Sequence, residues 1–357
     1  MDYKRRKLKK RRNNSYLIFI LFTTTIFLLI LCIFLLLSYK EQKSKTIQVI
    51  AEAELLEEKN KNLFTQEEVD SFIGETKKDV LDELKIMVED GEGMLSILQH
   101  FYPDYVIAPS DGNYYFYPIL DTLEKNNFDL EKFKYPVYND EKEQWEGTAT
   151  YMAGTKKEAK KGIDVSTFQG KIDWKKVKKT GIDFSIIRLG FRGYESGKIV
   201  LDSKFEDNIE GSIQSGLDTG VYFFTEALNE KEAIEEADFV IENLEGYKIK
   251  MPVVIDVEES ANTQKTRTKD LTSDQRTKNV IAFCERIIDA GYEVMIYGNL
   301  KSFMIMMNIE ELEKYDKWFA YYRYPFHFPY KIKMWQYTAQ EKIDGIEGKA
   351  DVNLMFY

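Results

Sequence analysis

One uninterrupted apolar segment sets the strongest constraint on this chain. Residues 17–39 contain no charged side chain and are rich in Leu, Ile and Phe. As a helix they would extend about 34 Å, which is enough to cross the roughly 30 Å hydrocarbon core of a bilayer. Eight Lys and Arg residues lie among the first twelve residues, and such clusters stay on the cytoplasmic side. We therefore predict a cytoplasmic basic tail at 1–16, a transmembrane helix at 17–39 and an extracellular remainder.

A cleaved signal peptide is the alternative to this anchor. Its apolar region normally spans about 7–15 residues and ends at a small-x-small site. The segment here is longer and runs into Leu36-Leu37-Ser38-Tyr39-Lys40. The comparison favours an anchor that stays in the protein, with the lipid bilayer as a partner through residues 17–39 and a single-pass location in the cell membrane.

Charge and the scarcity of Cys and His exclude several classes of function. The first twelve residues contribute +7 to a net charge of −10, so the other 345 residues sum to −17. So acidic a chain is not expected to bind the phosphates of nucleic acid. Two Cys and two His residues are too few for a disulfide framework or a Cys/His zinc site, and we expect no metal and no cofactor. Carboxylates are the abundant reactive groups that remain.

A charged helical stalk is predicted at 40–93. Thr65-Gln66-Glu67-Glu68 has the form of a capping box, apolar residues recur at helical spacing after it, and Asp90-Gly91-Glu92-Gly93 should end the helix. The stalk either dimerises or packs against its own neighbours. Only Val49, Leu56 and Leu63 fit a heptad, so we favour the second interpretation and keep self-association open.

A small aromatic-rich α+β module is predicted at 94–153, followed by a lysine-rich linker at 154–161. Residues 105–108 and 114–117 flank Pro109-Ser110-Asp111-Gly112-Asn113, a turn sequence that predicts a hairpin. The aromatic side chains either line a sugar-binding face or form a small core, and the core is the commoner use of such clusters. These residues are Phe101, Tyr102, Tyr105, Tyr114, Tyr115, Phe116 and Tyr117.

From residue 162 to residue 357, strand-like runs alternate with helical runs, which is typical of parallel strands joined by crossover helices. This pattern predicts an α/β fold, a TIM-like barrel whose active-site residues lie at the carboxyl ends of the strands. The predicted strands are 162–166, 184–189, 221–224, 252–258 and 293–297, with others near Trp318, Trp335 and Val352. The predicted helices are 204–216, 230–244 and 272–290.

Acidic residues stand where these strands end. Side chains alternate along the strand 252–258, so Asp256 and Glu258 point the same way. Their mutual repulsion and partial burial should raise the pKa of one, giving an acid that donates a proton near neutral pH beside a carboxylate that stays charged. Asp164 in the first strand and Asp351 in the last would face the same cleft. Single acids at strand ends are ordinary solvated residues or helix caps, but four together favour a catalytic site.

A series of short motifs runs through this part of the chain in order. They are 162–166 with 169–170, 220–224, 252–258, Tyr297, 318–321, 335–337 and 351–353. These motifs resemble those of glycoside hydrolase family 25, the muramidases also called Chalaropsis-type lysozymes. The resemblance covers residues 162–357 and leaves 1–161 outside. It implies an eight-stranded barrel with fewer than eight helices that hydrolyses the β-1,4 bond between N-acetylmuramic acid and N-acetylglucosamine of peptidoglycan, with retention.

The resemblance also implies roles for single residues. Glu258 matches the general acid, and Asp256 matches the acid that steadies the substrate's own acetamido group as it attacks the anomeric carbon. Asp164 and Asp351 match the remaining acidic pair. Four aromatic residues are candidates for contact with sugar or, equally, for barrel packing: Tyr222, Tyr297, Trp335 and Tyr337. Arg188 receives no role, and the long polar loop 259–270 is expected to carry specificity.

Two other functions remain open at this point. A barrel that binds glycan without cutting it would serve as a wall anchor or as a scaffold of a cell-envelope apparatus, and binding without turnover would favour it. A hydrolase of chitin-like polymers, or of the other glycosidic bond of peptidoglycan, would be recognised from the masses of its products.

Overall fold

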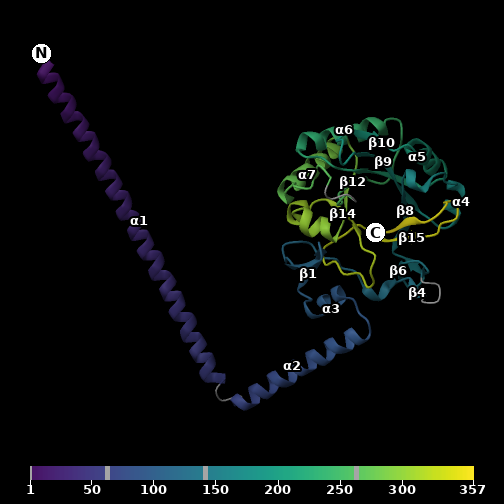
Figure 1. Cartoon of the computed structure of the whole chain (residues 1–357), viewed down its shortest axis with the longest axis horizontal. Coiled ribbons are helices and arrows are strands. Elements are labelled where there is room, and N and C mark those ends of the chain that lie inside the picture. Colours follow the sequence, from purple (N-terminus) through teal and green to yellow (C-terminus); the bar gives the residue numbers. More distant parts are fainter. Residues whose placement is uncertain (1, 61–64, 140–143, 261–264) are drawn as a thin grey trace. The chain divides into compact units, whose positions relative to one another are not determined.

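The computed structural model describes residues 2–60, 65–139, 144–260 and 265–357. The chain forms two compact units, Met1–Glu92 and Gly93–Tyr357 (Figure 1). This boundary lies where the predicted stalk ends. The aromatic-rich module and the barrel belong to the same unit, because they share one hydrophobic core.

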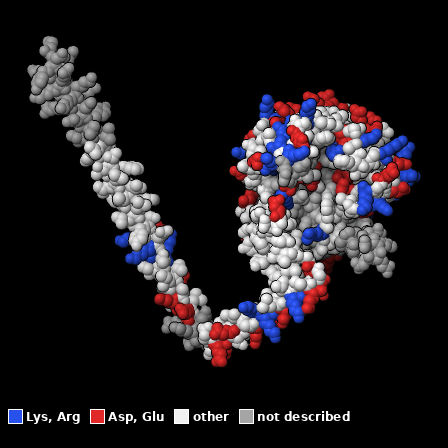
Figure 2. Space-filling view, viewed as in Figure 1, with Lys and Arg blue, Asp and Glu red and all other residues white. Residues whose placement is uncertain are grey.

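The first unit consists of two helices, α1 (Asp2–Asn60) and α2 (Gln66–Glu89). Residues 21–57 of α1 form a helix long and apolar enough to cross a membrane, and Figure 2 shows a stretch of it without charged side chains. At the start of α2 the predicted capping box is present, since the Thr65 hydroxyl accepts from the Glu68 N–H and the Glu68 carboxylate accepts from the Thr65 N–H. No residue of α2 is buried.

The second unit begins with α3 (Met94–Phe101) and the hairpin of β1 (Tyr105–Ser110) and β2 (Asn113–Pro118). The predicted turn is correct: the strands are antiparallel, and Gly112 has a φ of 78° that favours glycine. Short strands follow, with β3 (Phe133–Lys134), β6 (Thr150–Ala153) and β7 (Lys156–Lys157) in one sheet and β4 (Val137–Asn139) paired with β5 (Gln144–Glu146).

The predicted linker at 154–161 is replaced by ordered structure. β7 occupies Lys156–Lys157, and the first barrel strand, β8 (Ala159–Val165), already begins at Ala159. The module is held against the barrel by aromatic rings: the centroids of Phe128 and Phe356 are 4.3 Å apart, and those of Phe133 and Trp335 are 5.7 Å apart. The module therefore packs on the outside of the barrel rather than hanging from a tether.

Eight strands close the predicted barrel, in the order β8-β9-β11-β12-β13-β14-β15-β16, with β16 returning to β8. All neighbouring pairs are parallel except the two that involve β16, which runs antiparallel to both β15 and β8. The strands after β8 are β9 (Phe184–Arg192), β11 (Asp218–Phe224), β12 (Val253–Asp256), β13 (Val294–Asn299), β14 (Asp316–Ala320), β15 (Met334–Glu341) and β16 (Ala350–Phe356). A short strand, β10 (Ile199–Leu201), pairs with the end of β9.

In the described part of the chain, fewer than eight helices surround this barrel, as expected. They are α4 (Trp174–Lys179), α5 (Phe205–Gln214), α6 (Glu230–Leu244) and α7 (Ser273–Asp289), with short turns η1 (Leu130–Lys132), η2 (Thr167–Gln169), η3 (Ser302–Met306) and η4 (Ile309–Leu312) in the same unit. One apolar cluster, with Phe184, Val254 and Met295, belongs to inward-facing positions of the strands. Gly162 lies there because a Cβ atom at this position would stand 2.2 Å from the Phe184 ring.

Candidate active site

The four predicted acids come from three barrel strands whose relevant ends meet at one mouth. Asp164 is the penultimate residue of β8, Asp256 is the last residue of β12, and Glu258 follows two residues later. Asp351 is paired directly with Asp164 across the β16–β8 ladder. Charge interactions connect Glu258 with Asp351 and Asp256 with both Glu258 and Asp164. The acids thus form one cluster.

Asp351 reaches this mouth by a different route from the one predicted. We expected the acids at the carboxyl ends of parallel strands, but Asp351 is the second residue of β16. Because β16 runs antiparallel to its neighbours, its amino end lies where the other strands end. The direction of this strand is a feature that alternation of apolar residues does not reveal.

Hydrogen bonds fix Asp164 at the bottom of the cluster. Its Oδ2 atom accepts from the amides of Gln336 and Asn353, at 2.8 Å each. The Gln336 oxygen accepts in turn from the hydroxyls of Tyr297 (2.8 Å) and Tyr322 (2.5 Å). A buried side chain with two amide donors has a defined orientation, so Asp164 is part of a rigid polar layer at this mouth of the barrel.

Burial and mutual repulsion shift the proton affinities of the acids. Burial, with repulsion from Asp351, raises the pKa of Glu258 to about 7, although Tyr297 and Asn299 lower it by hydrogen bonding. Burial raises the pKa of Asp351 to about 6. The pKa values of Asp164 and Asp256 are raised well above the ordinary value, first by burial and then by the neighbouring acids. The cluster therefore holds protons near neutral pH, as a general acid requires.

Asp256 has an atom that the protein leaves unsatisfied. Its side chain is 6% exposed, and its Oδ1 atom has no hydrogen-bond partner among the described residues. Buried oxygens are almost always paired in folded proteins, so an unpaired one at a candidate site calls for an explanation. A ligand N–H group placed above β12 would supply the missing donor.

Two of the four aromatic candidates lie with the acids. Tyr222 is half-buried, and Tyr297 packs on Trp318 with ring centroids 4.5 Å apart. The acids raise the pKa of both tyrosines further, after burial. Tyr297 is only 6% exposed, so its hydroxyl serves the polar layer more than an open sugar-binding surface.

Trp335 and Tyr337 lie elsewhere and serve barrel packing, the second of their two predicted uses, so they are not sugar-binding residues. Both are fully buried in the outer core, where the Trp335 indole donates to the Tyr321 carbonyl and the Tyr337 hydroxyl contacts Thr148 and Glu341. Side chains alternate along β15, so the residue between them, Gln336, faces the acids instead.

The loop after Glu258 is attached to the barrel by Glu226, a carboxylate outside the cluster of four acids. This buried side chain accepts hydrogen bonds from the hydroxyls of Ser260, Thr266 (2.8 Å) and Thr268 (2.6 Å). The loop 259–270 was expected at the substrate face, and its residues 261–264 lie outside the described part of the chain. Ser260, Thr266 and Thr268, which lie on either side of this gap, therefore share one anchor at the end of β11.

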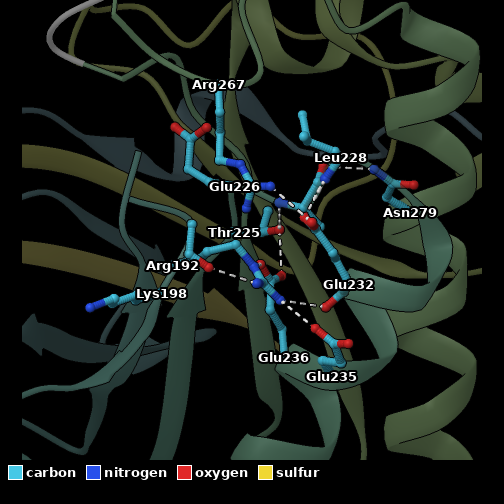
Figure 3. Close-up of polar contacts among 12 residues, drawn as sticks. Arg192, Lys198, Thr225, Glu226, Leu228, Glu232, Glu235, Glu236, Arg267 and Asn279 are labelled. Atoms are coloured by element: carbon cyan, nitrogen blue, oxygen red, sulfur yellow. Dashed lines mark hydrogen bonds and ion pairs between the residues drawn. The ribbon is translucent and has the colours of Figure 1, made fainter. Parts of the chain in front are cut away.

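A network of charges lies beside Glu226, whose backbone N–H donates to the Glu236 carboxylate (Figure 3). The Arg192 guanidinium donates to the buried carboxylate of Glu236 at 2.6 Å and to the Glu232 carbonyl at 2.8 Å. The Arg267 guanidinium, from the same loop, pairs with the Glu232 carboxylate at 2.8 Å. Burial raises the pKa of Glu236 to about 7. These contacts connect β9, the loop and the start of α6.

Similarity to known proteins identifies the family. The family model described as Glycosyl hydrolases family 25 matches residues 163–346, just over half of the chain. The chain belongs to this family. The match includes Asp164, Asp256 and Glu258 and ends before Asp351, so β16 is assigned to the same barrel by its pairing with β15 and β8.

Individual relatives of this family 25 chain are distant. An autolytic lysozyme of Clostridium acetobutylicum is 25% identical over 194 residues, which are 54% of this chain and 55% of the relative. Lysozyme M1 of Streptomyces globisporus is 26% identical over 203 residues, 54% of this chain and 66% of that protein. The chain therefore spans about half the length of the first relative.

A solved structure shows the same fold. The modular autolysin LytC of Streptococcus pneumoniae is 26% identical, with a TM-score of 0.51 over 71% of this family 25 chain and 61% of that one. The same autolysin has been solved in complex with a synthetic peptidoglycan ligand.

Proposed function

We propose that this chain is a membrane-anchored muramidase, which hydrolyses the β-1,4 bond between N-acetylmuramic acid and N-acetylglucosamine of peptidoglycan with retention. The acid cluster is the observation that carries the proposal, because it combines a carboxyl group with a pKa of about 7, Glu258, with three further acids at one barrel mouth. Membership of family 25 and the peptidoglycan-bound relative support the choice of substrate.

In the proposed reaction, protonated Glu258 donates its proton to the glycosidic oxygen as the bond to the anomeric carbon breaks. The carbonyl oxygen of the substrate's acetamido group forms a bond to that carbon, and the unpaired Oδ1 of Asp256 accepts the acetamido N–H. Ionised Glu258 then removes a proton from a water molecule. This water attacks the anomeric carbon and breaks its bond to the acetamido oxygen. Proton donation of this type typically contributes about 10²- to 10⁴-fold in rate.

The test uses the full chain in detergent on purified peptidoglycan. We expect fragments with reducing-end muramic acid, identified by mass spectrometry, and a loss of about 10²- to 10⁴-fold in rate for Glu258→Gln. Glu259→Gln is the matched control, because Glu259 is the adjacent residue but is exposed and paired with Lys301 at 2.7 Å. Equal activity of the native chain and Glu258→Gln would refute the role of Glu258.

The same products separate the alternatives. Reducing-end N-acetylglucosamine, or release of sugars from chitin only, would change the substrate and keep the hydrolase. Binding of glycan strands without any product between pH 4 and pH 9 would favour a wall anchor or an envelope scaffold, although such proteins have no need of a proton-holding acid cluster.

The anchor is part of the proposal. Residues 21–57 of α1 have the length and composition of a spanning helix, and the basic tail favours a cytoplasmic amino terminus and an extracellular barrel. Tethering would raise the local concentration of the barrel at the wall. Self-association through the stalk stays a prediction: α2 has exposed apolar residues, such as Ile73 and Leu81, and light scattering of the purified chain would measure it.

A further inference from the structure

The most exposed large apolar side chain of the described residues is Phe168, at 82%. It lies on η2, the turn that directly follows β8 and Asp164. Single exposed apolar residues are common on protein surfaces and by themselves indicate nothing. The position and support of this ring distinguish it from such residues.

The turn that carries Phe168 is held rigidly. The Phe168 N–H donates to the Ser166 hydroxyl at 3.2 Å, and the Ser166 N–H donates to the Gln169 side chain at 2.8 Å. The Thr167 N–H donates to the Asp202 carboxylate at 3.1 Å. Gly170 closes the turn with a φ of 62°. A ring presented by such a turn loses little backbone freedom when a ligand binds.

One face of the ring already has a partner. The Arg188 guanidinium carbon lies 4.9 Å from the centre of the Phe168 ring, and Arg188 is fixed by an ion pair with Asp202 at 2.7 Å. Arg188 also acts on the site, because its charge opposes the rise in the pKa of Asp256 and of Tyr222. The arginine that received no role from the sequence therefore connects the exposed ring with the acid cluster.

We propose that Phe168, supported by Arg188, is a stacking platform for a sugar ring of the glycan strand on the β8–β9 side of the acid cluster. The apolar faces of pyranose rings pack on aromatic rings, and the turn that carries Phe168 follows β8, the strand of Asp164. This inference rests on the proposed function, and it adds a binding residue that touches substrate away from the bond that is cut.

The test measures binding separately from turnover. Full-length Glu258→Gln protein in detergent is titrated with end-labelled soluble strands of alternating N-acetylglucosamine and N-acetylmuramic acid, and binding is followed by fluorescence anisotropy. Adding Phe168→Ala should weaken binding by about 3- to 10-fold, whereas Phe168→Trp should retain it. Ile288→Ala is the control, because Ile288 is an exposed apolar residue of α7 at 44%.

In the enzyme with Glu258 intact, Phe168→Ala should raise KM by a similar factor and leave kcat and the melting temperature nearly unchanged. Equal strand affinity of the Phe168→Ala and parental proteins would overturn the platform, and so would a lack of strand binding by the parent. A native chain that binds strands, loses affinity with Phe168→Ala and releases no fragments would refute hydrolysis while the platform stands.

Discussion

At the scale of single residues, the site depends on carboxyl groups whose ionisation is displaced by burial and by one another. Burial raises the pKa of Glu258 to about 7, and repulsion between its charge and that of ionised Asp351 adds to this rise. Neither group can be assigned a titration independent of the other. Both the pH range of activity and the stability of the barrel follow from this coupling.

The proposed enzyme should lose activity as the pH rises through about 7, since the fraction of protonated Glu258 then falls. Asp351→Asn removes the repulsion that favours the protonated form, so it should lower the pKa of Glu258. We expect the alkaline limb of the kcat/KM profile to move to lower pH. An unmoved limb in this variant would show that another group sets it.

Asp256 should lower the free energy of unfolding of the barrel at neutral pH. Its pKa is higher in the folded chain than in the unfolded one, so the folded state binds more protons and loses stability as the pH rises. Asp256→Asn should therefore stabilise the barrel by about 1–2 kcal/mol at neutral pH and above, while activity is lost. Thermal unfolding from pH 3 to pH 8 should show the two proteins converging below about pH 4, where aspartates are protonated in both states.

Sequence reasoning located the acids and missed the residues that hold them. Alternation along one strand was enough to place Asp256 and Glu258 together. In β15 alternation did not show which residues face the acids, because both faces of the strand are buried. Trp335 and Tyr337 contact the outer core, and Gln336 contacts Asp164. Tyr322 lies beyond the end of β14, where no periodicity applies.

At the scale of elements, the surroundings of Glu258 depend on how the loop after β12 is attached. Glu226, which follows β11, receives three hydroxyl donors from this loop. Removal of one buried acceptor leaves these donors unpaired, which typically costs about 1–3 kcal/mol per group. We expect the loop to become less ordered while the barrel stays folded, since the lost hydrogen bonds join Glu226 only to residues of this loop.

Glu226→Ala should therefore loosen residues 259–270 without unfolding the barrel. We expect new cleavage in this loop under limited proteolysis and a fall of about tenfold or more in kcat/KM, because Glu258 immediately precedes the loop. Glu235→Ala is the matched control, since Glu235 is a half-exposed carboxylate 3.5 Å from Arg192 in the same network. Similar effects of the two substitutions would argue against a specific role of Glu226.

Elements with strong local signals were predicted well. The helix predicted at 230–244 has the same bounds in the structure as α6, because its periodicity is clear and Asn229 caps it. α4 and β10 were missed, since elements of six and three residues carry little pattern. The order of the strands was predicted from the alternation of strand-like and helical runs. The antiparallel direction of β16 depends on its pairing with β15 and β8, which this pattern does not reveal.

At the scale of the whole molecule, the proposed enzyme combines a membrane-spanning helix with a barrel that acts on the wall. The double substitution Leu28→Arg/Leu31→Arg should cost about 5–7 kcal/mol of insertion free energy. We expect it to move the protein out of carbonate-washed membranes, whereas Leu28→Ala/Leu31→Ala should leave it there. Native protein found outside the membrane fraction, with residues 1–39 missing by mass spectrometry, would instead indicate a cleaved signal peptide.

The reversed last strand has a consequence for how such a protein comes into action. Asp164 and Asp351 are direct ladder partners although 187 positions separate them along the chain. A chain whose synthesis stalls before residue 351 lacks Asp351 and most of the strand that closes the sheet. In the proposed enzyme, the capacity to cut the wall would thus be acquired in a single late step, when β16 pairs with β8.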